Sequence, residues 1–182
     1  MTYSFKNKLE YSLGEREIFD IELLKKIIPK CVSITKTDED IDKTGIDYIA
    51  TLNGGATINI DAKTREPGSS KWWMHGEPEL ALERWSVIRQ NNVEPKIGWT
   101  LNTKSLVDYV LYTFDKSDSD KYFFIPFQIL RTVFQNNGKD WSNKYGIKIQ
   151  KSEHNSKWKS SAVFVPASIV LSEVGKLMQG IV

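Results

Sequence analysis

The stretch IDYIATLNGGATINIDAK, residues 46–63, decides the fold because two strand-like segments flank a tight turn. Residues 46–52 are rich in β-branched and aromatic side chains, and residues 57–63 alternate between apolar and polar ones. Asn53-Gly54-Gly55 stands between them, and these residues tolerate the positive φ angles that a tight hairpin turn requires. The sequence therefore predicts an antiparallel β-hairpin.

Polar side chains gather at one end of this predicted hairpin. Asp61 and Lys63 are two residues apart on the second strand, so their side chains point to the same face. Asp47 lies near the start of the partner strand, and the tight turn places it roughly across from Asp61 and Lys63. Two carboxylates and one amine are therefore expected to converge.

This set of side chains suits hydrolysis of a phosphodiester. Two carboxylates on adjacent strands can hold Mg²⁺, which prefers oxygen ligands and keeps several waters. A metal ion held in this way polarises a phosphoryl oxygen and lowers the pKa of bound water. Lys63 can orient or deprotonate the attacking water, or offset developing negative charge, and the sequence leaves these roles open.

A helix is predicted before the hairpin, over residues 15–28. Its apolar side chains recur at helical spacing, and Pro29 marks its end. Glu17 falls on the same stripe, four residues before Ile21 and seven before Leu24. An acid in the first turn of a helix is favoured by the helix dipole, which alone could account for Glu17.

The rest of the chain predicts further strands and helices. Proline after an apolar strand favours a helix start in both YFFIPF and VFVP. Strands are predicted over residues 31–34, 80–88 (in preference to a short helix), 106–114 and 122–127. Helices are predicted over residues 127–134 and 167–178. Residues 35–44 are predicted to form a loop, residues 65–78 a turn-rich segment, and residues 136–145 a loop or a short turn of helix. With no linker between these elements, residues 1–182 are predicted to form a single α/β domain.

Residues 15–90 resemble the PD-(D/E)XK nuclease superfamily. The pattern is a helix, a strand with aspartate in GIDY (residues 45–48), and a strand ending in IDAK (residues 60–63). The helix is also similar to the opening helix of archaeal Holliday-junction resolvases, where a helical glutamate completes the metal site, and Glu17 is the matching residue. The chain departs from the family name because no proline precedes Asp47.

The resemblance implies a restriction-endonuclease-like fold, with a central mixed β-sheet flanked by helices. It further implies a metal-dependent endonuclease that hydrolyses phosphodiester bonds in DNA. Glu17, Asp47 and Asp61 would hold Mg²⁺ or Mn²⁺, and Lys63 would complete the catalytic set. The alternative is a catalytically inactive module on the same fold that binds nucleic acid or a partner protein. Since two strand breaks on a duplex need two sites, a homodimer is also expected.

Two features outside the hairpin have alternative interpretations. Trp72 and Trp73 could stack on bases or cap the core under a loop. The basic residues Lys148, Lys151, Lys157 and Lys159 could follow a nucleic-acid backbone or form a solvated face.

Composition excludes several classes of protein. The 182 residues carry a formal net charge of +2, which does not by itself indicate a nucleic-acid binder. The single cysteine, Cys31, rules out an internal disulfide and is predicted to be buried, and no Cys/His cluster has zinc spacing. No apolar run approaches a membrane span and the N-terminus lacks the features of a signal peptide, so an intracellular, cytoplasmic protein without a membrane partner is expected.

Overall fold

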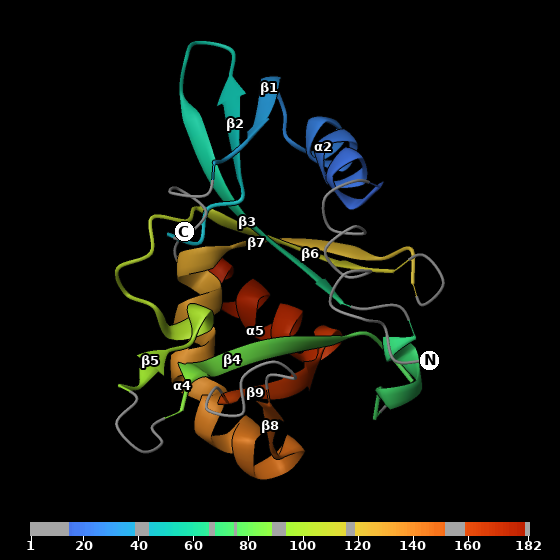
Figure 1. Ribbon diagram of the computed structural model, residues 1–182, viewed down its shortest axis with the longest axis vertical. Coiled ribbons are helices and arrows are strands. Elements are labelled where there is room, and N and C mark those ends of the chain that lie inside the picture. The colour runs from blue at the N-terminus through green and yellow to red at the C-terminus, as the bar shows by residue number, and fades with distance from the viewer. Residues whose placement is uncertain are drawn as a thin grey trace. The chain divides into compact units, whose positions relative to one another are not determined.

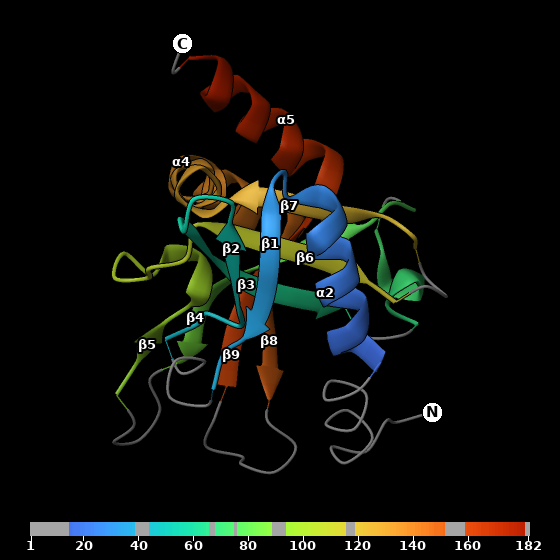
Figure 2. The same ribbon diagram turned by 90° about the horizontal axis from the view of Figure 1, so that it is seen from above.

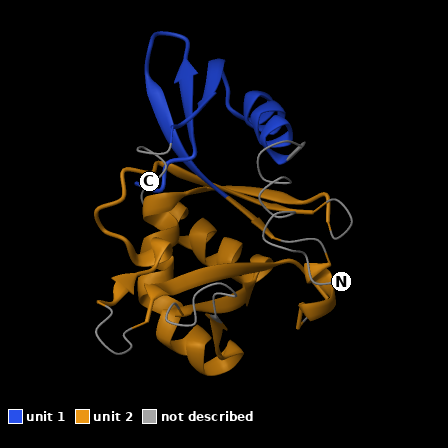
Figure 3. Ribbon diagram, viewed as in Figure 1, with its two compact units in different colours: residues 1–62 blue, residues 63–182 orange. Residues whose placement is uncertain are grey.

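The computed structural model describes residues 15–38, 44–65, 68–74, 76–88, 94–115, 119–151 and 159–180 (Figure 1). The chain divides into two units, residues 1–62 and 63–182 (Figure 3). The boundary falls within a single strand, β3 (Thr57–Arg65). Each unit is described by itself below, and the expected single domain over residues 1–182 stays a prediction.

The predicted hairpin is confirmed in the first unit. It consists of β2 (Tyr48–Leu52) and β3, which pair antiparallel with Tyr48 opposite Ile60. Gly54 and Gly55 form the turn at φ angles of 103° and 85°, a region that residues with a side chain rarely adopt. The local sequence therefore determines the turn and the register together.

A helix and a further strand complete the first unit: α2 (Glu15–Ile27) and β1 (Cys31–Lys36), which pairs antiparallel with β2. The buried residues of α2 are Asp20, Leu24 and, just beyond its end, Ile28, a line with a spacing of four. Two predictions are corrected here. The strand continues through Lys36, although a loop was predicted from residue 35, because its backbone pairs with β2; and Cys31 is half-buried, not buried.

The second unit contains a hairpin and a four-stranded sheet, whose strand pairs are all antiparallel. The sheet has the order β5-β4-β9-β8. The strands of this unit beyond β3 are β4 (Glu79–Val87), β5 (Lys96–Ile97), β6 (Tyr109–Phe114), β7 (Tyr122–Pro126), β8 (Ile147–Lys151) and β9 (Lys159–Pro166). The second predicted hairpin, β6 with β7, is confirmed, and so is the preference for a strand over a helix at residues 80–88.

Two helices pack on this sheet, α4 (Phe127–Tyr145) and α5 (Ala167–Gln179). They contact each other and β9 (Figure 2). Both start directly after a strand that ends in proline, as predicted. The prediction that the helical stretch stops at residue 134 is wrong. Helix α4 continues to Tyr145, because Trp141 and Tyr145 are buried against the rest of the unit.

Two short 3₁₀ turns, η1 (Ser69–Trp72) and η2 (Trp99–Leu101), lie within the connections of the second unit. The predicted α/β class is confirmed, since helices pack beside sheets of several strands. Within the described residues, no helix is long and apolar enough to cross a membrane.

Candidate functional site

The register of β2 and β3 brings two of the predicted site residues to the same level. The register of the strand pair ends with Tyr48 opposite Ile60, and Asp47 and Asp61 are the next residues beyond this pair on the two strands. Asp47 N donates a hydrogen bond to Ile60 O at 2.9 Å, which holds the backbone of Asp47 against β3 next to Asp61. The hairpin thus places both carboxylates at one end of the strand pair, as the sequence predicts.

The two carboxylates differ in environment. Asp61 is buried, with 3% of its surface exposed, and Asp47 is half-buried. Asp47 Oδ2 accepts a hydrogen bond from Ala62 N at 2.6 Å. A charged acceptor makes a stronger bond to a backbone amide than a neutral one does. One oxygen of Asp47 is therefore directed at β3, next to Asp61.

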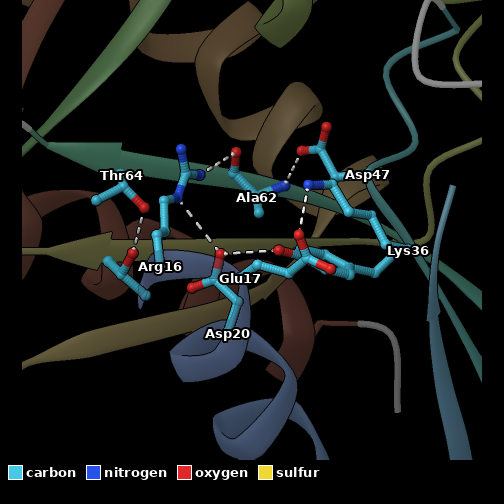
Figure 4. A network of polar contacts seen from close by, with 9 residues as sticks. Arg16, Glu17, Asp20, Lys36, Asp47, Ala62 and Thr64 are labelled. Atoms are coloured by element: carbon cyan, nitrogen blue, oxygen red, sulfur yellow. Dashed lines mark hydrogen bonds and ion pairs between the residues drawn. The ribbon is translucent and has the colours of Figure 1, made fainter. Parts of the chain in front are cut away.

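Ala62, the residue between Asp61 and Lys63, is held from a second side by helix α2. Arg16 Nη2 donates a hydrogen bond to Ala62 O at 3.1 Å. The amide hydrogen and the carbonyl oxygen of Ala62 are thus both bound by ionic side chains (Figure 4). These contacts restrict the backbone on which Asp61 is carried.

Arg16 also contacts a buried carboxylate on its own helix. Its Nε lies 3.4 Å from Asp20 Oδ2 (Figure 4). Tyr48 Oη donates a hydrogen bond to the same oxygen at 3.3 Å. Asp20 has none of its surface exposed, and within the described residues its Oδ1 has no hydrogen-bond partner. Figure 4 shows Arg16 between Asp20 and Ala62, so one guanidinium serves two acceptors.

The electrostatics of Asp20 link it to Asp47. Burial raises the pKa of Asp20 above its ordinary value of 3.8, while the charge of Arg16 and the hydrogen bond from Tyr48 lower it. The negative charge of Asp47 adds a further increase. Burial likewise raises the pKa of Tyr48, and the charge of Asp20 raises it further. The carboxylates of Asp20 and Asp47 therefore lie close enough to repel each other.

Glu17, the helical residue that the resemblance selects, has a different partner. Its Oε2 accepts a hydrogen bond from Lys36 Nζ at 2.8 Å, and the pair is partly exposed, at 30% for Glu17. Sequence reasoning did not find Arg16 or Asp20. The available signal was that Asp20 lies four residues before Leu24, on the line of α2 that is buried.

Lys63 is the first residue of the second unit. It is half-buried, and its Nζ lies 5.6 Å from the centre of the Trp99 ring, within the range of a cation–π contact. Glu83 holds the backbone at Trp99, because its Oε2 accepts hydrogen bonds from Trp99 N at 3.2 Å and from Ser86 Oγ at 2.7 Å. In the second unit, Lys63 therefore contacts a tryptophan whose backbone is held by Glu83.

The two tryptophans that follow the hairpin in the sequence have different environments. Trp72 is 66% exposed and has Lys71 Nζ 5.3 Å from its ring, whereas Trp73 is half-buried and meets Phe114 edge to face at 5.7 Å. Of these two, Trp72 is thus the one available for stacking on a base. Of the predicted basic run, Lys148 is exposed and Lys159 half-buried; the side chain of Lys151 and all of Lys157 lie outside the described residues.

The donor set can be compared with what Mg²⁺ requires. Among the described residues, no group of three or more His, Cys, Asp or Glu side chains is arranged to hold a metal ion. Asp47 and Asp61 nevertheless supply two oxygen donors at one end of the hairpin. Mg²⁺ sites that act on phosphates often use one or two carboxylates, with water and substrate oxygens completing the shell. The residues present therefore fit an ion that is held jointly with a phosphate.

The resemblance to PD-(D/E)XK nucleases accordingly depends on the helix and on the hairpin residues described above. No protein-family model, no curated protein and no solved structure matches this chain.

Proposed function

We propose that this chain is a metal-dependent endonuclease that hydrolyses phosphodiester bonds in DNA, on a restriction-endonuclease-like fold. The observation that carries the proposal is that Asp47 bonds to the residues on either side of Asp61, through its backbone N to Ile60 O and through its carboxylate to Ala62 N. Lys63 follows Asp61 by two residues on the same strand.

In this proposal Asp47 and Asp61 hold Mg²⁺ or Mn²⁺, and the bound ion supplies Lewis-acid activation of a phosphoryl oxygen and of a water. The ammonium of Lys63 donates hydrogen bonds to the attacking water or to a phosphate oxygen, and its charge offsets negative charge that develops in the transition state. Glu17 is the third carboxylate that the resemblance suggests, and it would have to exchange its contact with Lys36 to serve as a ligand.

Arg16 has a positioning role in the same proposal. By holding the carbonyl of Ala62 it restricts the backbone of β3 next to Asp61. Catalytic groups act well only when they are held close to the productive geometry. Arg16 thus affects the rate through Asp61, without touching the substrate.

A cleavage assay tests the proposal. Plasmid, linear and branched DNA are incubated with Mg²⁺ or Mn²⁺ and with the wild-type chain, Asp61→Ala, Lys63→Ala or Asp47→Asn. Glu22→Gln is the control, because Glu22 is an exposed carboxylate on α2, in the same unit as Asp47 and Asp61. We expect metal-dependent cleavage by the wild type and the control and its loss in the other variants. Equal inactivity of all proteins on every substrate overturns the proposal.

A catalytically inactive module that binds nucleic acid or a partner protein is the second candidate. It is favoured by the internal partners of the carboxylates: Glu17 binds Lys36, Asp20 binds Arg16, and Asp47 binds the Ala62 amide. Titration calorimetry with Mg²⁺ and Mn²⁺ separates the two candidates. Binding that disappears in Asp47→Asn supports the nuclease, and no binding by the wild type supports the module.

A homodimer belongs to the same proposal, because cutting both strands of a duplex needs two sites. The proposal also includes an intracellular, cytoplasmic location, where a protein that cleaves DNA meets its substrate. Sedimentation equilibrium of the wild-type chain, with and without a duplex, tests the dimer. A monomer under both conditions contradicts this part.

A further inference from the structure

Two cationic side chains of the second unit lie against one aromatic ring. Arg65 Cζ and Lys148 Nζ are each 4.7 Å from the centre of the Phe164 ring. Phe164 is buried, with 4% of its surface exposed, while Lys148 is exposed and Arg65 half-buried. Two positive charges are therefore held close to the same buried ring.

Strand geometry explains how they meet. Lys148 pairs with Ala162 across β8 and β9, so it shares a face of the sheet with Phe164, two residues further along β9. The hydroxyl oxygen of Thr64, on β3, lies 2.6 Å from that of Thr113, on β6. Arg65 follows Thr64 and points to the opposite face of that strand. Its contact with Phe164 therefore comes from fixed strand positions.

Arg65 and Lys148 have no close carboxylate partner among the described residues. Within the described residues, neither Arg65 nor Lys148 forms an ion pair, and the buried Nε of Arg65 has no hydrogen-bond partner. A buried polar group without a partner costs free energy. A cation–π contact is attractive but supplies no counter-charge. Among the described residues, the two cations therefore meet at Phe164 without a direct ionic partner.

Carboxylates on the neighbouring strand β4 are occupied elsewhere. Glu79 is buried and accepts a hydrogen bond from Met74 N at 2.9 Å. Glu83 accepts those from Trp99 and Ser86 described above. Burial raises the pKa of Tyr112, and the charge of Arg65 is the strongest cause that opposes this rise. The positive charge of Arg65 thus extends into the interior of the unit.

We propose that Arg65 and Lys148, supported by Phe164, form an anion site that takes a phosphate group of a nucleic-acid backbone. A guanidinium presents paired N–H donors that match two phosphate oxygens. The lysine adds a flexible point charge at the exposed side of the site. A phosphate between them supplies a direct ionic partner for both cations.

This inference goes beyond the proposed nuclease activity, since it requires neither a divalent metal nor cleavage. It is tested in EDTA, so a failure here leaves the cleavage experiment intact, and an inactive Asp61→Ala chain is still expected to bind.

The experiment measures binding of fluorescein-labelled single-stranded and duplex oligonucleotides by anisotropy, over a series of salt concentrations in EDTA. The variants are Lys148→Ala, Lys148→Glu and Arg65→Gln. Lys144→Ala is the matched control, because Lys144 is an exposed lysine of the same unit whose Nζ lies 5.2 Å from the Tyr145 ring. Circular dichroism checks that each variant folds. Because Lys148 is exposed, its variants still provide a test if Arg65→Gln fails to fold.

We expect Lys148→Ala to weaken binding roughly threefold and to lower the slope of log affinity against log salt by about one, as for one lost phosphate contact. Lys148→Glu weakens binding more, since the new carboxylate occupies the site and pairs with Arg65. Changes in Lys148→Ala no larger than in Lys144→Ala overturn the proposal. Inorganic phosphate serves as the competitor. Phosphate binding that is lost in Lys148→Ala, without oligonucleotide binding by the wild type, overturns the assignment to a nucleic-acid backbone.

Discussion

Replacing Arg16 by methionine tests the charge network of the first unit most directly. Methionine keeps much of the apolar stem of arginine but removes the guanidinium. The variant loses the hydrogen bond to Ala62 O at 3.1 Å and the contact with Asp20 Oδ2 at 3.4 Å. A completely buried carboxylate is then left without its cationic partner.

The size of the effect follows from the burial of the two groups. Removing one partner of a buried ion pair costs about 3–5 kcal/mol. Asp20 is 0% exposed, but Arg16 retains 23% exposure, so solvent already screens part of the attraction. We therefore expect Arg16→Met to lower the free energy of unfolding by about 3 kcal/mol at pH 7, the lower end of that range.

The sign of the pH dependence is also fixed. Burial raises the pKa of Asp20 above its unfolded value, so the cost of burying the charged form is absent below about pH 4 and grows as pH rises through the folded pKa. Without Arg16, a cause that lowers this pKa is gone and the folded pKa rises further. The stability difference between the wild type and Arg16→Met is therefore expected to shrink on acidification.

Chemical unfolding followed by far-UV circular dichroism at pH 7 and pH 4.5 measures these differences. Tryptophan fluorescence is unsuitable, because the first tryptophan is Trp72 and lies in the second unit. Asp20→Asn completes a double-mutant cycle, and we expect it to recover about 1–2 kcal/mol in the Arg16→Met background. Equal stability of Arg16→Met and the double variant, or a larger loss at pH 4.5 than at pH 7, refutes the reasoning.

Substitutions at three other positions have expected outcomes. Glu17→Gln breaks a partly exposed ion pair with Lys36, so it should lower stability by less than about 1 kcal/mol and reduce metal-dependent cleavage less than Asp47→Asn does; equal losses contradict this. Asp47→Ala removes the acceptor of a strand amide and should cost about 1–3 kcal/mol in urea unfolding, whereas Asp47→Asn keeps an oxygen there and should unfold close to the wild type. Gly98→Ala puts a Cβ 2.4 Å from the backbone oxygen of Glu83, so the free energy of unfolding, followed by tryptophan fluorescence, should fall by about 1–3 kcal/mol. An unchanged unfolding midpoint would mean that the backbone at Gly98 shifts without cost.

The hairpin could be predicted because its determinants are local. A turn that needs positive φ at Gly54 and Gly55, followed by strict alternation, specifies both the pairing and the register. The position of Asp47 beside Asp61 follows from these alone. Proline at the helix starts is equally local, which is why the beginnings of α4 and α5 were predicted correctly.

The network around Asp20 could not be predicted in this way. Its contacts join residues far apart in sequence: Arg16 to Ala62 over 46 positions, and Tyr48 to Asp20 over 28. Apolar periodicity indicates which side of a helix is buried, but it does not reveal that an aspartate lies on that side with a partner. A polar residue is normally assigned to the exposed face, so Asp20 was passed over.

Helix α4 shows a similar effect of long-range packing. Residues 136–145 are rich in Asn, Gly, Asp and Ser, which favour loops. The helix persists because Trp141 and Tyr145 bury large rings, and Trp141 meets Phe134 at 6.3 Å. Tertiary packing thus overrides a weak local preference.

The boundary within β3 limits how the protein can be dissected. A fragment that ends at Ala62 retains Asp47 and Asp61 but lacks Lys63, and the complementary fragment begins with the lysine and has neither carboxylate. Neither piece alone can therefore report on the proposed chemistry. A gene fusion or domain exchange that cuts the chain between the two units would separate Asp61 from Lys63. The two units therefore have to be expressed and engineered as one segment.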